Sequence, residues 1–182
     1  MPRVLLAYSG SLNTTLAIPW LIQERGCEVI TFAANLGYGE YLKTLGDHAL
    51  EAGASAAHIG DLRERFVQDY VLPAFRASAK YESGYFLAAA LGRPLIAFEL
   101  VRLASEFGCN VVAHGCTERG NNQVRFETAI AALAPDQDGF GRAWLDDNTV
   151  QFQLCDCPDV ERADVARQPV VLGEVEDVRE AC

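Results

Sequence analysis

Apolar residues along the chain follow two different spacings. Short continuous runs, such as residues 4–8 and 29–33, are typical of strands buried on both faces. Residues 14–25 and 121–133 instead repeat their apolar positions with the period of a helix, and Gly26 ends the first of these. The pattern predicts strands at 4–8, 29–33, 56–59 and 110–113, and helices at 14–25, 40–52, 62–79, 86–107 and 121–133.

Two of the predicted helices contain residues that interrupt helices. Pro73 lies within 62–79, and we expect a kink or a break there because proline lacks an amide hydrogen. In 86–107, Gly92 is expected to break the helix and Pro94 to begin a new one. This segment is therefore predicted as two pieces.

Strands and helices alternate with short connections over residues 1–135. This order predicts an α/β domain, a doubly wound parallel sheet with helices on both faces. Residues 136–182 are expected to form a short acidic C-terminal appendage with one or two strands, and not a second domain. In this tail Val150, Phe152 and Leu154 alternate with polar residues, and 170–172 is the second candidate strand.

The tail is also expected to take part in assembly. Its predicted strand at 150–154 has no second sheet in the sequence, and exposed strand edges are usually paired or covered. We therefore expect the chain to form a homo-oligomer or to bind a protein partner through the tail.

The negative net charge of the chain limits the classes of molecule that it is expected to bind. The 182 residues carry a net charge of −10, and residues 145–182, with ten acidic and three basic residues, contribute −7 of it. This balance argues against nucleic acid or an anionic membrane as the main partner. Lys43 and Lys80 are the only lysines, which leaves few candidates for a phosphate-binding lysine. No apolar run approaches the ~20 residues that span a bilayer, the first residues do not resemble a signal peptide, and a cytoplasmic location is expected.

Cysteine spacing predicts no metal site. The six cysteines include no Cys-x-x-Cys pair. Cys27 and Cys109 adjoin strand-like runs and are expected to pack as small hydrophobic residues. Cys155 and Cys157 lie close together, but no histidine near them in the sequence completes a set of zinc ligands.

Polar, glycine-rich loops follow three predicted strands, at residues 9–15, 34–40 and 114–123. In open α/β sheets, ligands bind outside the carboxyl ends of the strands, where the strand order reverses. The 9–15 loop opens a helix and offers hydroxyl and N–H groups, so it could hold phosphate; the alternative is an ordinary N-cap. His114, at a strand end, is either an acid or base or a hydrogen-bonded structural residue.

Residues 7–15, Ala-Tyr-Ser-Gly-Ser-Leu-Asn-Thr-Thr, resemble the pyrophosphate loop of the N-type ATP pyrophosphatases, and in particular that of the argininosuccinate synthase family. Further segments are similar to this family, namely 34–37 with Glu40, 66–74, 81–97 and 114–127, of which the last is the most specific motif. The resemblance is collinear over residues 3–135. It implies the nucleotide-binding fold of that family for this part of the chain.

The resemblance also implies a function. It implies binding of ATP, with Mg²⁺ carried by the nucleotide, and ligase chemistry in which a citrulline-like group attacks the α-phosphate, pyrophosphate leaves and an amine displaces AMP. The nucleotide-binding residues that it implies are Ala7, Tyr8, Ser9, Gly10, Ser11, Asn13, Thr14, Thr15, Ala34 and Gly115. The residues that it implies for an amino-acid substrate are Tyr81, Tyr85, Arg93, Thr117, Asn121, Asn122 and Arg125. No catalytic side chain is assigned.

This sequence departs from the family within those motifs. The substituted positions are Ser11 for a glycine, Asn13 for an aspartate, Gly84 for an arginine, Ala89 for a threonine, Glu118 for a glycine and Asn122 for an aspartate. An amide keeps the hydrogen bonds of a carboxylate but loses its charge, and with it the attraction for cations. The two Asp-to-Asn changes are therefore expected to weaken both magnesium handling and recognition of an α-amino group.

Three functions are compatible with these residues. The first is an ATP-dependent ligase of the argininosuccinate synthase type with impaired chemistry. The second is a catalytically inactive nucleotide- or partner-binding module, which is favoured by an acidic tail in the place of the family's large C-terminal domain. The third, a thiol-dependent sulfur transferase, rests on Cys155, Cys157 and Cys182 alone.

Overall fold

The computed structural model describes residues 1–37, 39–81, 84, 87–109, 111–116 and 121–134, with the side chains of residues 40 and 43 left out. It also describes the backbone of residues 140–146, 149–154 and 170–171.

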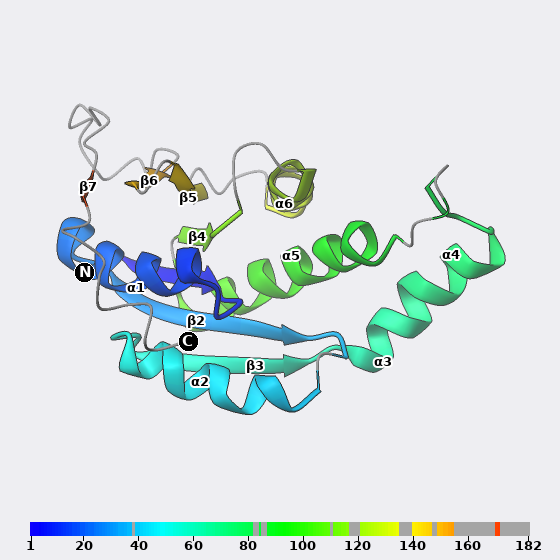
Figure 1. Cartoon of the computed structure of the whole chain (residues 1–182), viewed down its shortest axis with the longest axis horizontal. Helices are drawn as coiled ribbons and strands as arrows, with labels where there is room; N and C mark the ends of the chain where they lie inside the picture. Colours follow the sequence, from blue (N-terminus) through cyan, green and yellow to red (C-terminus); the bar gives the residue numbers. More distant parts are fainter. Residues whose placement is uncertain are drawn as a thin grey trace.

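The described strands form one seven-stranded sheet in the order β3-β2-β1-β4-β5-β6-β7 (Figure 1). The first five strands along the chain pair in parallel, and β6 and β7 pair antiparallel. From β1 in the interior of the sheet, the chain winds outward to β2 and β3, crosses back, and continues on the other side with β4 and β5. The strands are β1 (Arg3–Ala7), β2 (Glu28–Asn35), β3 (Ala56–Asp61), β4 (Val111–His114), β5 (Phe140–Asp146), β6 (Thr149–Leu154) and β7 (Val170–Val171).

Helices connect the parallel strands. They are α1 (Leu12–Arg25), α2 (Leu42–Glu51) after a 3-10 turn at Gly39–Tyr41, α3 (Arg63–Phe66), α4 (Leu72–Arg76), α5 (Ala88–Phe107) and α6 (Asn121–Leu133). The predicted end at Gly26 is found, and the helix predicted to end at residue 107 stops at Gly108; both glycines have the left-handed conformation that glycine adopts without strain. In the described part of the chain, no helix is both long and apolar enough to cross a membrane.

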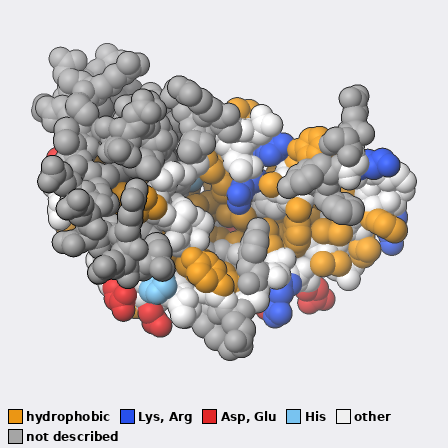
Figure 2. Space-filling model, in the orientation of Figure 1, with side chains coloured by type: hydrophobic (Ala, Val, Ile, Leu, Met, Phe, Trp, Pro, Cys, Tyr) orange, Lys and Arg blue, Asp and Glu red, His pale blue; other side chains and the backbone are white. Residues whose placement is uncertain are grey.

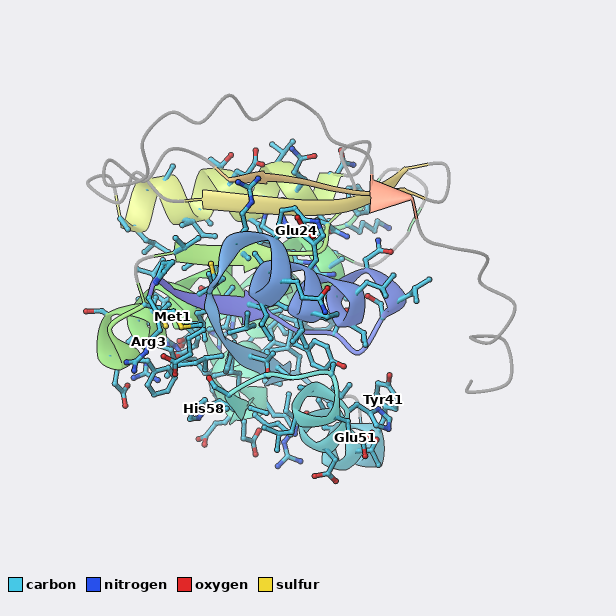
Figure 3. The ribbon with its side chains drawn as sticks, turned by 90° about the vertical axis from the view of Figure 1, so that its left-hand side faces the viewer. Met1, Arg3, Glu24, Tyr41, Glu51 and His58 are labelled. Atoms are coloured by element: carbon cyan, nitrogen blue, oxygen red, sulfur yellow. The ribbon has the colours of Figure 1, made fainter. Side chains whose placement is uncertain are left out.

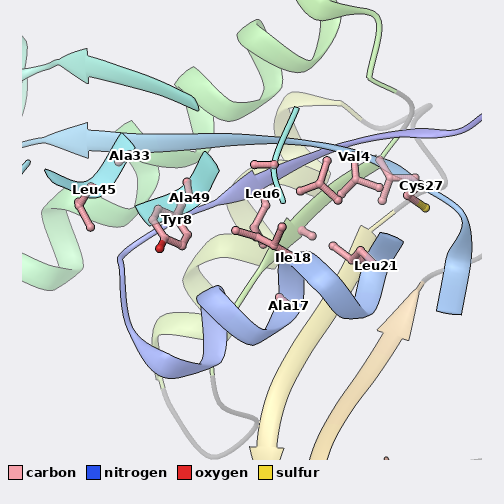
Figure 4. Packing of buried hydrophobic residues seen from close by; sticks show 14 of the residues in the cluster. Val4, Leu6, Tyr8, Ala17, Ile18, Leu21, Cys27, Ala33, Leu45 and Ala49 are labelled. Atoms are coloured by element: carbon pink, nitrogen blue, oxygen red, sulfur yellow. The ribbon is translucent and has the colours of Figure 1, made fainter. Parts of the chain in front are cut away.

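Successive residues of β1 face two different cores. Val4 and Leu6 pack with Ile18 and Leu21 of α1 on one face of the sheet (Figure 4). Leu5 packs on the other face with residues of α5 and α6. These β1 side chains are fully buried, as a parallel strand covered on both sides requires. The predicted doubly wound α/β architecture is therefore confirmed.

The prediction that 86–107 breaks at Gly92 is wrong, because α5 runs without a break from Ala88 to Phe107 and contains Pro94. Gly92 is buried, and a Cβ atom there would lie 2.9 Å from Cδ1 of Leu36 and 3.9 Å from the ring of Phe66. The glycine thus allows close contact with neighbouring segments and does not end the helix. Pro94 costs the early turns of α5 one backbone hydrogen bond.

The helix predicted over 62–79 does not break at Pro73, because the backbone stays helical from Arg63 to Arg76; the irregularity lies one turn before the proline. Val67–Val71 forms a π-helical turn between α3 and α4, and Pro73 lies in the first turn of α4. Proline there cannot donate to the carbonyl group four residues back, and a wider turn before it accommodates that loss. In Figure 1 these short helices extend beyond the end of β3 towards the start of α5.

A buried carboxylate joins these short helices to α5. Glu99 is only 6% exposed, and its two oxygens accept hydrogen bonds from Arg65 Nη1 at 2.6 Å and Arg102 Nε at 2.8 Å. The guanidinium of Arg65 also lies 4.3 Å from the centre of the Phe98 ring. Because Glu99 is paired on both oxygens, its charge is tolerated inside the domain.

The strand predicted at 150–154 is found as β6, and the expected unpaired edge is found only in part. One edge of β6 pairs along its length with β5, a strand that the sequence did not indicate, and on the other edge only Thr149 and Val150 pair with β7 among the described residues. Since β5 pairs in parallel with β4, the tail extends the main sheet. Assembly through the tail and the boundary at residue 135 stay predictions.

We expect Glu99→Gln to lower the free energy of unfolding by about 1.5–3 kcal/mol, because two charge-assisted hydrogen bonds lose their charge in a buried position. Glu106→Gln is the matched control. Glu106 accepts a hydrogen bond from the same Arg102 at 2.7 Å but is exposed, so its change should stay within about 0.5 kcal/mol. Urea unfolding followed by circular dichroism measures both, and equal losses would contradict the assigned role of Glu99.

Candidate functional site

The candidate site lies where the strand order reverses. The carboxyl ends of β1 and β4 are adjacent, with Ala7 paired to His114. After them the chain continues into α1 on one face of the sheet and α6 on the other, which leaves the crevice expected at such a point. A cavity of about 560 Å³ opens there. Figure 2 shows a hollow near the middle of this face, with hydrophobic side chains in its depth and a basic side chain at its edge.

Three hydroxyl groups meet in the 9–15 loop at one wall of the cavity. Ser9 Oγ lies 2.9 Å from Ser11 Oγ, and both lie 3.3 Å from Thr14 Oγ1. Thr14 Oγ1 donates to the backbone oxygen of Ser11 at 3.0 Å. Ser11 occupies the N-cap position of α1, but its side chain makes no capping hydrogen bond. The first N–H groups of α1 are therefore not used by the side chain that an ordinary N-cap would supply.

Two glycines allow other segments to approach this loop closely. Gly10 has a φ of +72°, and a Cβ atom there would overlap Cδ2 of Leu45 and lie 2.7 Å from the hydroxyl of Tyr41. A Cβ atom on Gly115, after β4, would lie 2.6 Å from Cγ2 of Thr14. The loop is thus held between α2 on one side and the end of β4 on the other.

Apolar side chains from both faces of the sheet make up much of the remaining described lining, which we call the apolar wall. They are Ala33 and Ala34 from β2, Leu42 and Leu45 from α2, and Ile96 from α5. Ala34, one of the predicted nucleotide-binding residues, belongs to this wall. A surface of this kind can accept a flat aromatic group.

Arg93 supplies the positive charge of the cavity. Among the described residues that line the cavity, it is the only Lys, Arg, Asp or Glu. Its Nε atom is buried without a hydrogen-bond partner in the described structure, and its guanidinium lies 5.6 Å from the centre of the Phe126 ring. An unpaired buried N–H of a cation is costly, so an anionic ligand would be favoured here.

Residues predicted for an amino-acid substrate form a chain of contacts beside Arg93. Arg125 donates to the hydroxyl of Tyr81 at 2.8 Å and to Oδ1 of Asn122 at 3.4 Å, and Asn122 lines the cavity. Asn121 is exposed at the start of α6, and within the described part of the chain no contact joins its side chain to this group. The predicted Tyr85 and Thr117 lie outside the described residues.

Contacts with Cys116 and Phe126 hold His114 in place. It is 4% exposed, its Nδ1 accepts a hydrogen bond from the backbone N–H of Cys116 at 3.3 Å, and its ring stacks on Phe126 with centroids 5.3 Å apart. These contacts agree with the structural interpretation of His114. Cys116 lines the cavity beside it, and burial raises the pKa of its thiol, with Arg93 acting in the opposite direction.

The other cysteines do not join the site. Cys27 and Cys109 are buried in the two cores, as predicted, and burial raises the pKa of both thiols. Cys155, Cys157 and Cys182, on which the sulfur-transferase hypothesis rests, lie outside the described residues.

The described residues do not build a magnesium site of their own. The described lining of the cavity has no carboxylate, and nowhere among the described residues do three or more His, Cys, Asp or Glu side chains gather as metal ligands. Magnesium prefers carboxylate and phosphate oxygens. These residues therefore do not fit a metal held by the protein alone.

Most predicted nucleotide-binding residues are brought together. Ala7, Tyr8, Ser9, Thr14, Ala34 and Gly115 line the cavity. Gly10, Ser11, Asn13 and Thr15 belong to the same loop without lining it; Thr15 Oγ1 lies 3.1 Å from the Tyr8 hydroxyl, and a Cβ atom on Gly115 would lie 3.5 Å from Cβ of Asn13.

Sequence reasoning missed much of the apolar wall. The lining residues that it did not assign to binding are Phe32, Ala33, Tyr41, Leu42, Leu45, Ile96, His114, Cys116 and Phe126. A signal existed for part of this set. Leu42, Leu45 and Ala49 recur with helical spacing on one face of 40–52, which marks the face of α2 that turns towards the sheet.

Two solved structures show weak likeness to the chain. A predicted subunit of tRNA methyltransferase from Methanocaldococcus jannaschii aligns with a TM-score of 0.43 and 13% identity, over 66% of this chain and 56% of that one. A universal stress protein from Archaeoglobus fulgidus aligns with a TM-score of 0.38 and 12% identity, over 73% and 87%. Scores this low carry no argument about this chain.

Similarity to curated proteins is much stronger. The chain is 57% identical over 135 residues to the argininosuccinate synthase of Synechococcus sp. (strain CC9605) and 52% identical over 136 residues to that of Pelotomaculum thermopropionicum. These matches cover 74% and 75% of this chain but 34% of each relative, so the chain spans about a third of the length of the curated relatives it matches. Residues 3–143 match the family described as "Arginosuccinate synthase N-terminal HUP domain", and the chain therefore belongs to the argininosuccinate synthase family.

Proposed function

We propose that the domain binds an adenine nucleotide, with its phosphates on the 9–15 loop and its base against the wall that contains Ala34. The observation that carries this proposal is one cavity whose lining combines hydroxyl groups with an apolar wall. Ser9 and Thr14 line the cavity and form a hydroxyl cluster with Ser11 at the start of α1, and the wall that contains Ala34 is apolar. Phosphate suits the hydroxyl cluster because helix N-termini attract anions, and a purine suits the apolar wall.

The second part of the proposal concerns an amino-acid substrate. Arg93 offers a guanidinium at the cavity, and the contact chain of Tyr81, Arg125 and Asn122 lies beside it. Guanidinium groups bind carboxylates with directional hydrogen bonds. We propose that Arg93 holds the carboxylate of such a substrate, and that Arg125 keeps Asn122 oriented towards it.

The family implies that these two ligands would react with each other, as in synthesis of argininosuccinate. The chemistry would need the α-phosphate and the attacking oxygen to be positioned and the developing charge to be stabilised. In this chain, Asn13 and Asn122 stand where the family has aspartates, so two negative charges are missing from the first turns of α1 and α6. We propose that Mg²⁺ enters only with the nucleotide phosphates and that ligase activity is impaired.

A nucleotide-binding module without catalysis is the second candidate. This candidate is favoured because Asn122 lines the cavity. An asparagine in place of an aspartate there weakens recognition of an α-amino group, and it removes no group that the proposed nucleotide site needs. The two candidates share the nucleotide site and differ only in turnover.

Nucleotide binding predicts protection of Cys116. We expect ATP to slow alkylation of this thiol by N-ethylmaleimide, because the ligand would fill the cavity that Cys116 lines. The raised pKa of Cys116 leaves less thiolate at neutral pH than a free cysteine has, so the labelling rate should rise with pH. Mass spectrometry of the labelled peptides measures the rate at each cysteine.

Two controls define this experiment. Cys109 lies in a core away from the cavity lining, so ATP should not change its labelling. In Ser9→Tyr the new ring should occupy the phosphate position, and ATP should make no further difference at Cys116. Equal labelling of Cys116 with and without ATP in the unmodified protein would contradict the proposed nucleotide site.

Activity is expected to be undetectable with citrulline, aspartate and ATP. Removing one preorganised contact to developing charge typically costs about 2.7–4 kcal/mol, or roughly 10²–10³ in rate. Losses at Asn13 and Asn122 together should therefore lower the rate by ~10⁴ or more, even when they are only partly additive.

A pyrophosphate-release assay tests this expectation. Asn13→Asp alone should not restore activity, because Asn122 still leaves the amino-acid side without its carboxylate. Release at ordinary enzyme rates that depends on both amino acids would contradict the impaired chemistry and select the active ligase.

A further inference from the structure

Tyr41 is a large aromatic residue on the rim of the cavity that the proposed function does not yet use. It ends the 3-10 turn Gly39–Tyr41 and directly precedes α2, and Figure 3 labels it beside the α2 ribbon. Its backbone oxygen accepts a hydrogen bond from Thr44 Oγ1 at 3.0 Å, which fixes the start of the helix. The side chain lines the cavity but remains 55% exposed.

The hydroxyl of Tyr41 lies against the backbone of the 9–15 loop. It is 2.7 Å from the position that a Cβ atom on Gly10 would occupy, and that contact is possible only because residue 10 is a glycine. The only hydrogen bond found for Tyr41 within the described structure is made by its backbone oxygen. The phenol group is therefore free to donate to a ligand that lies on the loop.

Tyr41 lies where the 9–15 loop meets the apolar wall. It lines the cavity and directly precedes Leu42 of that wall, and its hydroxyl and Leu45 Cδ2 both approach Gly10 of the loop. Tyrosine suits such a boundary because it has an apolar body and a polar tip. A ligand that contacts both the loop and the apolar wall would therefore lie close to Tyr41.

The described lining of the cavity has little positive charge, so a further hydrogen-bond donor would strengthen binding of a phosphate. Arg93 is the only charged side chain in the described lining, while a nucleotide carries several negative charges on its phosphates. Arg93 reaches the cavity from α5 and Tyr41 from the start of α2, so the two donors come from opposite faces of the sheet. A phenol donor beside Gly10 would add a hydrogen bond to a phosphate oxygen, and a hydrogen bond to a charged acceptor is stronger than one to a neutral acceptor.

Resting on the proposed nucleotide site, we propose that Tyr41 determines its specificity for phosphorylated ligands: the phenol hydroxyl donates to a phosphate oxygen on the 9–15 loop, and the ring covers the sugar between phosphate and base. Tyr41 thus selects nucleotides over nucleosides.

Calorimetric titration of the full chain with ATP and with adenosine tests this proposal. Tyr41→Phe keeps the ring and removes only the hydroxyl, so ATP affinity should fall by about 10-fold or more. Adenosine, which lacks phosphate, should bind the variant and the unmodified protein equally. Tyr70→Phe is the matched control, since Tyr70 packs near Phe66 in the other core, and it should bind both ligands normally.

The outcomes separate this proposal from the proposed function. If the unmodified protein binds ATP and Tyr41→Phe binds it equally well, the role of Tyr41 is overturned and the nucleotide site stands. If adenosine loses as much affinity as ATP, the hydroxyl does not act on phosphate, and the proposal is again overturned. If the unmodified protein does not bind ATP, the proposed function fails and this inference fails with it. Thermal unfolding checks that the Tyr41→Phe variant stays folded.

Discussion

The close approach of three chain segments at the end of β1 is the constraint on which the rest of the site depends. The 9–15 loop has to fit between α2 and the end of β4, and it fits because Gly10 and Gly115 carry no side chain towards their neighbours. A single methyl group at either position would meet Tyr41 or Thr14. The hydroxyl cluster, the placement of Tyr41 and the width of the cavity all follow from this spacing, because a packed interior transmits displacements of this size.

Much of the fold could be predicted from local pattern. β1 and β2 are recognisable as continuous apolar runs, and α1 ends at Gly26 as its sequence indicates. The wrong prediction of a helix break at Gly92 has a different origin. The absence of a side chain at this position leaves space for Leu36, a residue far away in the sequence. β5 was missed for a similar reason. Its residues mix apolar and charged types, and its place is set by pairing with β4 and β6.

The residues of the candidate site also fall into two groups, those that a local sequence pattern identifies and those that only distant contacts bring there. Ser9, Thr14 and Arg93 were identified because they occur in segments with a recognisable order of residues, and they line the cavity. Tyr41, just before α2, and Leu45, within α2, reach Gly10 only through packing of that helix on the sheet. No local pattern around residue 10 indicates which aromatic residue will lie beside it. Contacts between distant segments are what a single sequence conveys least.

The cluster of Ser9, Ser11 and Thr14 has one more consequence. Its hydroxyl groups already pair with one another and with the backbone of Ser11, so an arriving anion has to exchange these internal bonds for its own. That exchange requires only that hydroxyl hydrogens turn about their C–O bonds, since a hydroxyl rotates to suit its acceptor. Binding of the proposed phosphate would therefore need no displacement of the loop backbone, and the hydroxyl cluster would act as a set of donors already in position.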